Sequence, residues 1–187
     1  MAQNLEVKIR SHRDEVAAIR ANLVSQGSSL TRLQQVDRYF RVPHGRLKLR
    51  QITPERGPLT TELIAYRRPD ATGPRWSTYR RLPLSAADAD ELQRALTETI
   101  GVLVVVRKAR DVALHGRTRI HLDDVADLGA FVELETVVTE PADDRAAADL
   151  AETATLIGID PHGSETIADS YADLLLARDN RSPTMRM

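Results

Sequence analysis

In several short stretches of this 187-residue sequence, charged side chains of the types that bind phosphate and metal ions recur at every second position. Over residues 46–50, Arg46, Lys48 and Arg50 alternate with two leucines. Because successive side chains of a β-strand point to opposite faces, such a stretch gathers its cations on one face. The same alternation aligns Glu6 with Lys8, Glu62 with Tyr66 and Arg68, Arg75 with Ser77, Tyr79 and Arg81, Lys108 with Arg110, Arg119 with His121 and Asp123, and Glu133 with Glu135.

Any one of these stretches is compatible with an open sheet whose polar face lies in water. The set as a whole favours an enclosed anion, because several stretches carry cations in succession and like charges facing each other across strands repel. A triphosphate, with about four negative charges and many acceptor oxygens, would relieve that repulsion. Carboxylates in the same space would hold Mg²⁺ or Mn²⁺, which bridge phosphate oxygens.

Strands joined by short turns are expected to position these side chains. The pattern predicts strands near residues 3–10, 35–42, 45–52, 59–68, 75–82, 102–112, 117–125 and 130–138. Helices are predicted over 12–26, from a capping box at Ser85, from Pro141 to Gly158, and from a cap at Ser164. This order favours an α+β fold, an eight-stranded antiparallel β-barrel or a strongly curved sheet with peripheral helices, over a βαβ fold. We expect one domain over residues 1–178 and a flexible C-terminal tail over 179–187.

The composition excludes several classes of function. The 26 basic and 27 acidic side chains give a formal net charge of -1, which argues against a general nucleic-acid binder. The chain has no cysteine, so disulfides, thiol nucleophiles and thiolate-bound zinc are excluded. No apolar run approaches the roughly 20 residues of a membrane span, and the first residues lack the pattern of a signal peptide. We therefore expect a cytoplasmic protein without membrane or nucleic-acid partners.

Several ordered stretches resemble the CYTH superfamily, which includes class IV adenylate cyclases and thiamine triphosphatases. The resemblance covers about residues 3–176, and its motifs occur in the order found in the family. The stretches that carry it are residues 4–8, 37–40, 45–50, 63–70, 106–110, 119–123, 128–135 and 170–175.

The resemblance implies a triphosphate tunnel, in which eight antiparallel strands enclose a channel with a metal ion at one side. Carried over residue by residue, it implies catalytic roles for Glu6, Lys8, Glu133 and Glu135. The implied ligands of Mg²⁺ or Mn²⁺ are Glu6, Glu133 and Glu135, with Asp123 as a weaker candidate. The implied phosphate-binding residues are Lys8, Lys48, Arg50, Arg68, Lys108, Arg110 and Arg119.

Asn4 departs from the family pattern, which usually has glutamate at this position. An amide oxygen can bind a metal but brings no charge, so the number of metal ions and the reaction stay open. The substrate could be a nucleotide, thiamine triphosphate or tripolyphosphate, and the reaction hydrolysis or cyclisation to a cyclic nucleotide and pyrophosphate. We favour hydrolysis, because attack by water demands less exact placement of a sugar. The alternative is a non-catalytic polyphosphate- or nucleotide-binding module, and either could be a monomer or a homodimer.

Two residues keep alternative readings. His121 shares a polar face with Arg119 and Asp123, where it could either handle a proton or hydrogen bond, or simply pack. Tyr171, in the last predicted helix, could cover one mouth of the tunnel or pack the helix against the strands.

Overall fold

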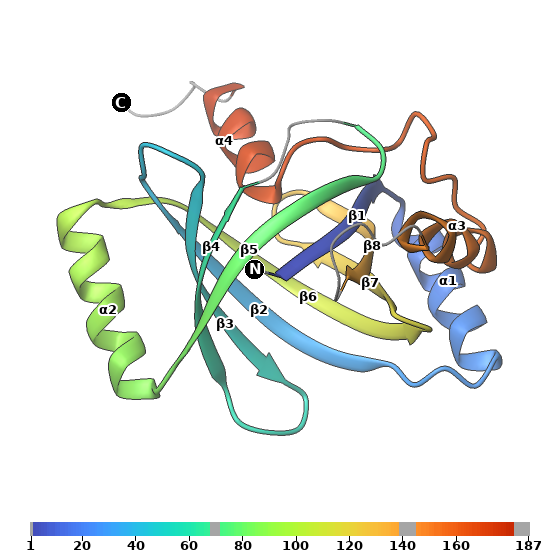
Figure 1. Ribbon diagram of the computed structural model, residues 1–187, viewed down its shortest axis with the longest axis horizontal. Helices are drawn as coiled ribbons and strands as arrows, with labels where there is room; N and C mark the ends of the chain where they lie inside the picture. The colour runs from blue at the N-terminus through green and yellow to red at the C-terminus, as the bar shows by residue number, and fades with distance from the viewer. Residues whose placement is uncertain (1, 68–71, 139–144, 182–187) are drawn as a thin grey trace.

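Eight antiparallel strands close into a barrel in the computed structural model of this protein, which describes residues 2–67, 72–138 and 145–181 (Figure 1). The strands are β1 (Ala2–Arg10), β2 (Thr31–Phe40), β3 (Arg46–Pro54), β4 (Thr60–Arg67), β5 (Arg75–Leu84), β6 (Val102–His115), β7 (Thr118–Val125) and β8 (Gly129–Val138). Their order around the barrel is β1-β5-β4-β3-β2-β6-β7-β8. The predicted α+β class with an eight-stranded antiparallel barrel is confirmed, although β2 begins earlier and β6 ends later than the sequence pattern predicts.

The helices described are α1 (Arg13–Ser25), α2 (Ala86–Thr99), α3 (Ala146–Leu156) and α4 (Tyr171–Arg181). In Figure 1, α1 and α3 lie on one side of the barrel, where both contact β7 and β8, and α2 lies on the other side against β4 and β5. Helix α4 contacts β6 at one end of the barrel. Within the parts of the chain that the structure describes, no helix combines the length and apolar character needed to cross a membrane.

The main hydrophobic core lies outside the barrel, between its wall and the helices α1 and α3. Because side chains alternate along a strand, the inward-facing residues of β1 are Asn4, Glu6 and Lys8, and its apolar residues face outward. Each fully buried leucine or isoleucine of this core contributes about 1.5 to 3 kcal/mol. The core includes Leu5, Val7, Ile9, Ile19, Leu23, Ile120, Leu122, Val132, Leu134, Leu150 and Ala154.

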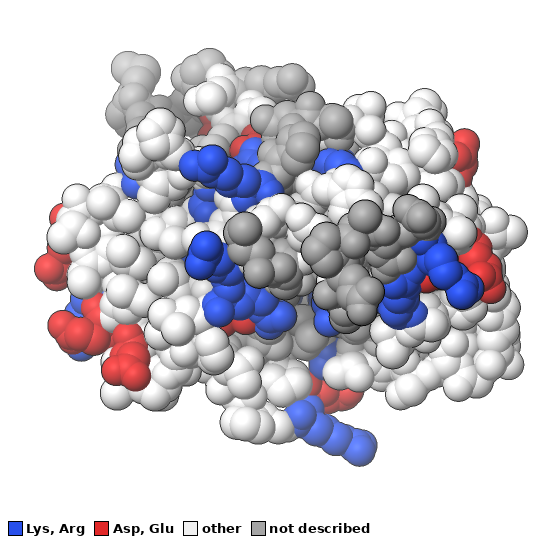
Figure 2. All heavy atoms as spheres, viewed as in Figure 1, with Lys and Arg blue, Asp and Glu red and all other residues white. Residues whose placement is uncertain are grey.

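Helix α2 begins as the sequence predicts and carries acidic charge away from the barrel interior. Ser85 is its N-cap, and its hydroxyl oxygen accepts a hydrogen bond from the backbone N–H of Asp88 over 3.2 Å. In Figure 2 acidic side chains gather at the edge of the molecule where α2 lies, whereas Lys and Arg lie over the middle of the same face. The exposed acids of this helix are Asp88, Asp90, Glu91 and Glu98.

The last helix begins later than predicted, which corrects the assignment of Ser164 as its cap. Helix α4 begins at Tyr171, and the capping residue is Ser170. The hydroxyl oxygen of Ser170 accepts a hydrogen bond from the backbone N–H of Asp173 over 3.2 Å.

Strand pairing explains why the segment before α4 is not helical. The pairing of β1 with β5 ends at Glu6, so the rest of β1 has no strand partner on that side. The backbone N–H of Arg10 donates to the carbonyl oxygen of Glu165, and the N–H of Ile167 donates to that of Lys8, each over 2.9 Å. Buried backbone groups need such partners, and residues 165–167 supply them instead of forming a helix.

Two predicted boundaries fall near residues that the structure does not describe. The predicted start of the third helix at Pro141 lies outside the described residues, and α3 begins at Ala146. Helix α4 continues through residues 179–181, which were expected to begin the flexible tail, and residues 182–187 lie outside the described part.

Candidate active site inside the barrel

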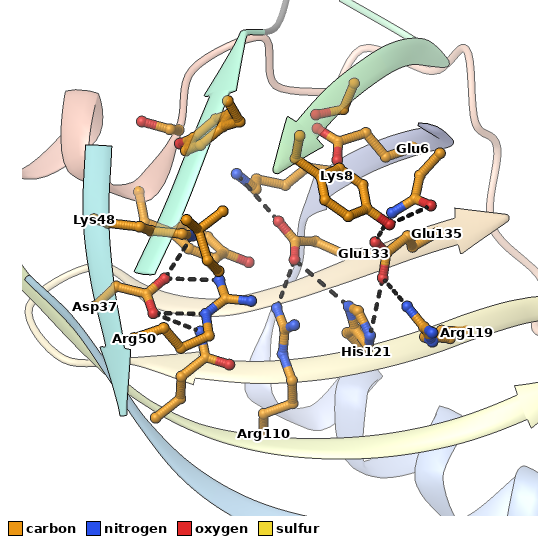
Figure 3. A pocket seen from close by; sticks show the side chains of 18 of the residues that line it. Glu6, Lys8, Asp37, Lys48, Arg50, Arg110, Arg119, His121, Glu133 and Glu135 are labelled. Carbon is orange, nitrogen blue, oxygen red and sulfur yellow. Dashed lines mark hydrogen bonds and ion pairs between the residues drawn. The ribbon is translucent and has the colours of Figure 1, made fainter. Parts of the chain in front are cut away.

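The inward faces of the strands surround a cavity of about 360 Å³ (Figure 3). Among the described residues, eight Lys and Arg but five Asp and Glu line it. The wall therefore carries an excess of positive charge, although the chain as a whole has a formal net charge of -1. Such a concave wall concentrates anions. The cations are Lys8, Lys48, Arg50, Arg75, Arg81, Lys108, Arg110 and Arg119, and the acids are Glu6, Asp37, Glu62, Glu133 and Glu135.

Asp37 of β2 holds two of these cations in place. Arg50 Nε and Nη2 donate to its two carboxylate oxygens, each over 2.8 Å, and Lys48 Nζ donates to Oδ2 over 2.8 Å. Burial by itself would raise the pKa of Asp37, but the charges of Arg50 and Lys48 hold it far below its usual range. Burial and the charge of Arg50 lower the pKa of Lys48 to about 7, even though Asp37 opposes the shift.

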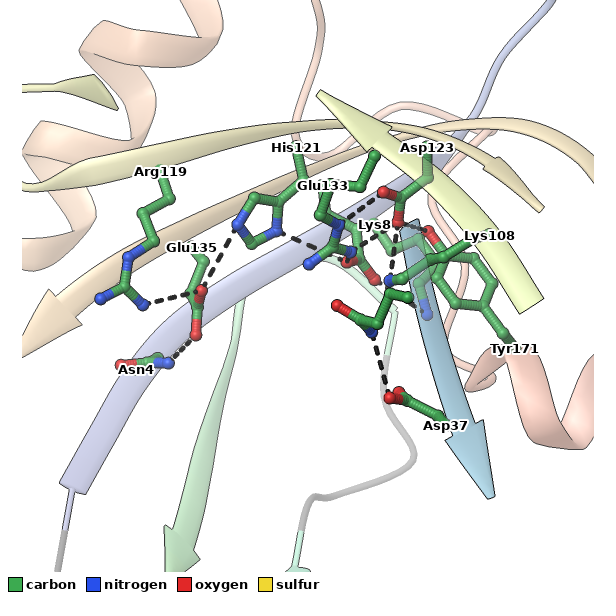
Figure 4. A network of polar contacts seen from close by, with 12 residues as sticks. Asn4, Lys8, Asp37, Lys108, Arg119, His121, Asp123, Glu133, Glu135 and Tyr171 are labelled. Atoms are coloured by element: carbon green, nitrogen blue, oxygen red, sulfur yellow. Dashed lines mark hydrogen bonds and ion pairs between the residues drawn. The ribbon is translucent and has the colours of Figure 1, made fainter. Parts of the chain in front are cut away.

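Asp123 of β7 holds a second pair of cations in place in the same way. Arg110 Nε and Nη2 donate to its carboxylate oxygens over 2.5 Å, and Lys108 Nζ donates to Oδ2 over 3.0 Å (Figure 4). The hydroxyl of Tyr171 donates to Oδ2 over 2.9 Å. Burial by itself would raise the pKa of Asp123, but the charges of Arg110 and Lys108 lower it to about 2. Its side chain is fully buried, so this carboxylate orients the cations from behind.

Three glutamates from β1 and β8 face the cavity. In the register of these strands Glu6 is directly opposite Glu135, and Lys8 is directly opposite Glu133. Lys8 Nζ lies 3.2 Å from Glu133 Oε1, and Arg110 Nη2 donates to Glu133 Oε2 over 2.6 Å. Burial would raise the pKa of Glu133, but the neighbouring cations, Lys8 foremost, lower it well below its ordinary value. The three glutamate side chains remain between a fifth and a quarter exposed, so they can reach a ligand.

His121 of β7 lies between two of the glutamates (Figure 4). Its Nδ1 is 3.7 Å from Glu133 Oε2, and its Nε2 is 3.7 Å from Glu135 Oε2. Both distances are too long for hydrogen bonds. Nδ1 is buried and has no hydrogen-bond partner. Burial and the charge of Arg110 lower the pKa of His121, although Glu133 and Glu135 oppose the shift.

Both the nitrogen and the oxygen of the Asn4 side-chain amide form hydrogen bonds. Its Nδ2 donates to Glu135 Oε1, and its Oδ1 accepts a hydrogen bond from the hydroxyl of Tyr79 over 3.0 Å. Arg119 Nη1 donates to the other oxygen of Glu135 over 3.2 Å. In this arrangement Asn4 positions Glu135.

Helix α4 contributes Tyr171 to the lining of the cavity. The ring centroid of Tyr171 lies 3.9 Å from Lys8 Nζ and 4.8 Å from Lys108 Nζ, within the range of cation–π contacts. Arg46 Nη2 of β3 donates to Asp173 Oδ2 of α4 over 2.6 Å. Tyr171 therefore both packs the helix and lines the cavity, so the two readings of this residue are compatible.

Most of the predicted site residues face this one cavity. Arg68 lies outside the described residues. Asp123 lies behind Lys108 and Arg110 and is not among the residues that line the cavity. The predicted residues that do line it are Glu6, Lys8, Lys48, Arg50, Lys108, Arg110, Arg119, Glu133 and Glu135. Their chemical roles stay predictions.

The sequence interpretation assigned no role to several residues that line the cavity. Arg75 Nη1 donates to the carbonyl oxygen of Ile167 over 2.9 Å, and Arg81 Nε donates to Glu62 Oε2 over 2.7 Å. The alternation along residues 75–81 already places the two arginines on one face, and this signal could have identified them. Asp37 gives a weaker signal, because a single acid on β2 does not reveal its partners on β3.

The donor atoms here suit a divalent cation. Among the described residues, no three His, Asp or Glu side chains lie close enough together to bind one metal ion. Glu133 and Glu135 form ion pairs with Lys and Arg instead. Carboxylates are nevertheless the ligands that Mg²⁺ and Mn²⁺ prefer. Glu6 and Glu135 face each other with like charges, and His121 leaves a buried nitrogen unsatisfied. A cation bound by these carboxylates would relieve the repulsion, and one beside Glu133 would also satisfy Nδ1, so the donor set fits a metal.

Solved structures with this fold share little sequence with the chain. The PH1012 protein from Pyrococcus horikoshii OT3 superposes with a TM-score of 0.72 at 18% identity, over 91% of this chain and 98% of that one. A candidate adenylate cyclase from Vibrio parahaemolyticus superposes with a TM-score of 0.69 at 19% identity, over 92% of this chain and 97% of that one. The candidate adenylyl cyclase HpAC1 from Hippeastrum, which has a dominant triphosphatase activity, gives 0.61 at 15% identity, over 96% of each chain. At these identities the similarity shows the fold alone.

Sequence comparison gives the family. None of the curated proteins matches this chain. The CYTH domain, in contrast, matches residues 2–167, a range that includes all eight strands of the barrel and every residue that lines the cavity except Ser170 and Tyr171. With the match extending over most of its length, this chain belongs to the CYTH domain family.

Proposed function

We propose that this protein is a divalent-metal-dependent enzyme that binds a triphosphate inside the barrel and hydrolyses it. The observation that carries the proposal is the excess of Lys and Arg in a cavity inside a closed barrel. A triphosphate brings about four negative charges and acceptor oxygens for several cationic donors. Family membership supports the same substrate class.

The cations would bind and orient the phosphoryl groups. Lys48 and Arg50 on β3 and Lys108 and Arg110 on β6 flank β2, and the buried carboxylates hold all four before any ligand arrives. Preorganised charges of this kind stabilise the charge that develops on the leaving phosphate, because they need not reorganise during the reaction. Arg119, on the neighbouring strand β7, would add a further contact.

Glu6, Glu133 and Glu135 would hold Mg²⁺ or Mn²⁺. When bound, such a cation supplies charge neutralisation and polarisation of a phosphate oxygen. Asn4 holds Glu135 in place and accepts a hydrogen bond from Tyr79, so three carboxylates remain for metal binding, which favours a single ion. Ser170 and Tyr171, at the start of helix α4, line the cavity as well.

Hydrolysis is the reaction we favour over cyclisation. A ribose 3′-hydroxyl must be placed in line with the α-phosphate, whereas water needs no such anchoring of a sugar. HpAC1, with the same fold, has a dominant triphosphatase activity, which supports this choice.

Incubation with candidate substrates tests the proposal. The purified protein should be mixed with ATP, GTP, CTP, thiamine triphosphate or tripolyphosphate and with Mg²⁺ or Mn²⁺, and the products resolved by phosphorus NMR. We expect phosphate or pyrophosphate to appear only with metal. Glu133→Gln should reduce turnover by roughly a hundredfold or more, in the range seen when one group acting on transition-state charge is removed. The exposed substitution Glu91→Gln is the matched control. Full activity in both Glu133→Gln and Glu135→Gln would reject the metal site.

A second candidate is a binding module without turnover. The observation that favours it is Asn4, whose amide replaces a charge that the family pattern usually places beside the metal. Saturable binding of tripolyphosphate by calorimetry, together with no product from any of the five substrates, would establish this reading. Restored turnover in Asn4→Glu would then identify the missing carboxylate as the reason.

A further inference from the structure

The imidazole of His121 lies among the carboxylates of the cavity, and its surroundings leave Nδ1 without a hydrogen-bond partner. Its residue is 6% exposed, and its buried Nδ1 has no hydrogen-bond partner. Buried polar groups in native proteins almost always have partners, so an orphaned one requires an explanation. The nearest acceptor, Glu133 Oε2, is already used by Arg110 at 2.6 Å and lies 3.7 Å from Nδ1.

The separation of Nδ1 from Glu133 suits two ligands of one metal ion. Metal–ligand bonds of about 2.1 Å place two ligand atoms of the same ion roughly 3 to 4 Å apart. The observed 3.7 Å lies in that range. His121 and Glu133 are also direct partners in the β7–β8 register, so the backbone fixes their spacing.

The other ring nitrogen is placed as it is in most metal-bound histidines. A histidine ligand usually donates its second N–H to a carboxylate, which fixes the tautomer and the ring orientation. Nε2 of His121 lies 3.7 Å from Glu135 Oε2, and Glu135 is itself held by Asn4 and Arg119. A small movement of the ring would turn this approach into a hydrogen bond.

We propose that Nδ1 of His121 is a ligand of the metal ion, beside Glu133, and that it makes the site prefer Mn²⁺ to Mg²⁺. This inference rests on the proposed metal dependence and adds a residue and a selectivity to it. An imidazole nitrogen is a softer ligand than a carboxylate oxygen and binds transition-metal ions better than Mg²⁺, which favours all-oxygen coordination. In this refinement Glu135 no longer binds the ion directly: it accepts from Nε2 and orients the ring, and Glu6 and Glu133 remain as the carboxylate ligands.

Pulsed EPR of Mn²⁺ bound to the protein, with no triphosphate present, tests the proposal independently of activity. The ¹⁴N modulation of a nitrogen ligand should appear in the wild-type spectrum and change to that of ¹⁵N when the histidines are labelled. It should be absent in His121→Gln and present in His115→Gln. The second variant is the matched control, because His115 bonds to Thr153 of α3 outside the cavity.

Metal affinities measured by calorimetry give a second readout. His121→Gln should weaken Mn²⁺ binding by roughly 10- to 100-fold, the range for losses near a metal, and Mg²⁺ binding by much less. The isotope change in the wild-type protein identifies a histidine ligand but not which of the five histidines it is, so if His121→Gln does not fold, His121→Asn takes its place in both measurements.

The outcomes separate this inference from the proposed function. Mn²⁺ binding without nitrogen coupling, with triphosphate turnover intact, overturns the His121 ligand and leaves an all-carboxylate metal site. No Mn²⁺ binding together with turnover that survives chelation overturns both the ligand and the metal dependence. Nitrogen coupling that persists in His121→Gln also overturns the assignment.

Discussion

The buried carboxylate of Asp37 keeps together two cations that would otherwise repel each other. Lys48 and Arg50 both contact it, and all three side chains belong to the lining of the cavity. Removing one partner of a buried ion pair typically costs about 3 to 5 kcal/mol, because an uncompensated charge remains. A bound polyphosphate could replace that lost negative charge.

Asp37→Asn should therefore destabilise the protein mainly when it is free of ligand. We expect a fall in melting temperature of roughly 6 to 12 °C without ligand, from a loss of about 3 kcal/mol. Saturating tripolyphosphate should shrink this difference, which differential scanning fluorimetry would measure. Glu91→Gln, which breaks an exposed pair with Arg94, should leave the melting temperature unchanged. An equal fall in melting temperature with and without tripolyphosphate would show that bound phosphate does not replace the negative charge of Asp37.

Lys48 should make triphosphate binding depend on pH near neutrality. Its pKa is lowered from 10.5 to about 7, so the folded protein releases this proton before the unfolded chain does as the pH rises. The lysine therefore destabilises the fold below about pH 7, and that penalty is relieved as the pH rises from there toward 10.5. Phosphate, in contrast, needs the charged form, so tripolyphosphate affinity should fall several-fold as the pH rises through 7.

Calorimetry without metal between pH 6 and 9 measures this effect, and Lys48→Arg is the control. Arginine stays charged over the whole range, so the variant should lose the steep part of the curve while sharing any titration of the ligand. The same pH dependence in both proteins would assign the effect to the ligand or to another residue.

At the scale of elements, helix α4 packs against the barrel through a hydrophobic cluster and is also tied to it by polar contacts at its first turn. Asp173 joins it to the barrel through Arg46, and the same carboxylate accepts a hydrogen bond from Ser170 at the start of the helix. Tyr171 reaches from the first turn to Asp123. The first turn of α4 is thus hydrogen-bonded to Asp123, the carboxylate that orients Lys108 and Arg110 on β6.

Asp173→Asn should loosen α4 without disturbing the barrel. It weakens both the N-cap interaction and the ion pair with Arg46, a combined loss of about 1 to 2 kcal/mol. Hydrogen exchange in residues 171–181 should then be roughly tenfold faster, since 1.4 kcal/mol is a tenfold change, whereas β7 and β8 should exchange as before. Asp179→Asn, an exposed position further along the same helix, should have no effect. Faster exchange throughout the barrel would show that α4 and the strands open as one unit.

For the whole molecule, the important electrostatic property is the contrast between the cavity and the remaining surface. The chain is nearly neutral, the cavity wall is cationic, and acidic side chains are exposed on α2 (Figure 2). A ligand that carries several negative charges should therefore stabilise the folded protein far more than one with one or two.

Tripolyphosphate at a hundred times its Kd should stabilise the fold by about 2.7 kcal/mol. For a chain of this length that corresponds to a rise in melting temperature of roughly 5 to 10 °C. Orthophosphate at the same concentration should give a much smaller rise in the same fluorimetric assay. Equal shifts from both anions would indicate general screening of charge and would count against a site built for a triphosphate.

The sequence by itself determined which side chains share a face of each strand. In residues 46–50 and 133–135 this follows from the period of two, which is a local property of an extended chain. The cap at Ser85 is equally local. For these reasons the strands, most of the helices and most residues of the cavity wall could be predicted.

Only the tertiary structure decided which of these residues meet. The amide of Asn4 contacts Glu135, 131 positions away, and Asp37 meets Lys48 only because β2 pairs with β3 in one register. The late start of α4 likewise depends on the backbone groups of β1 left unpaired by β5. Closure of the barrel brings distant strands together, and no periodicity within one segment records the partner that it will have in the fold.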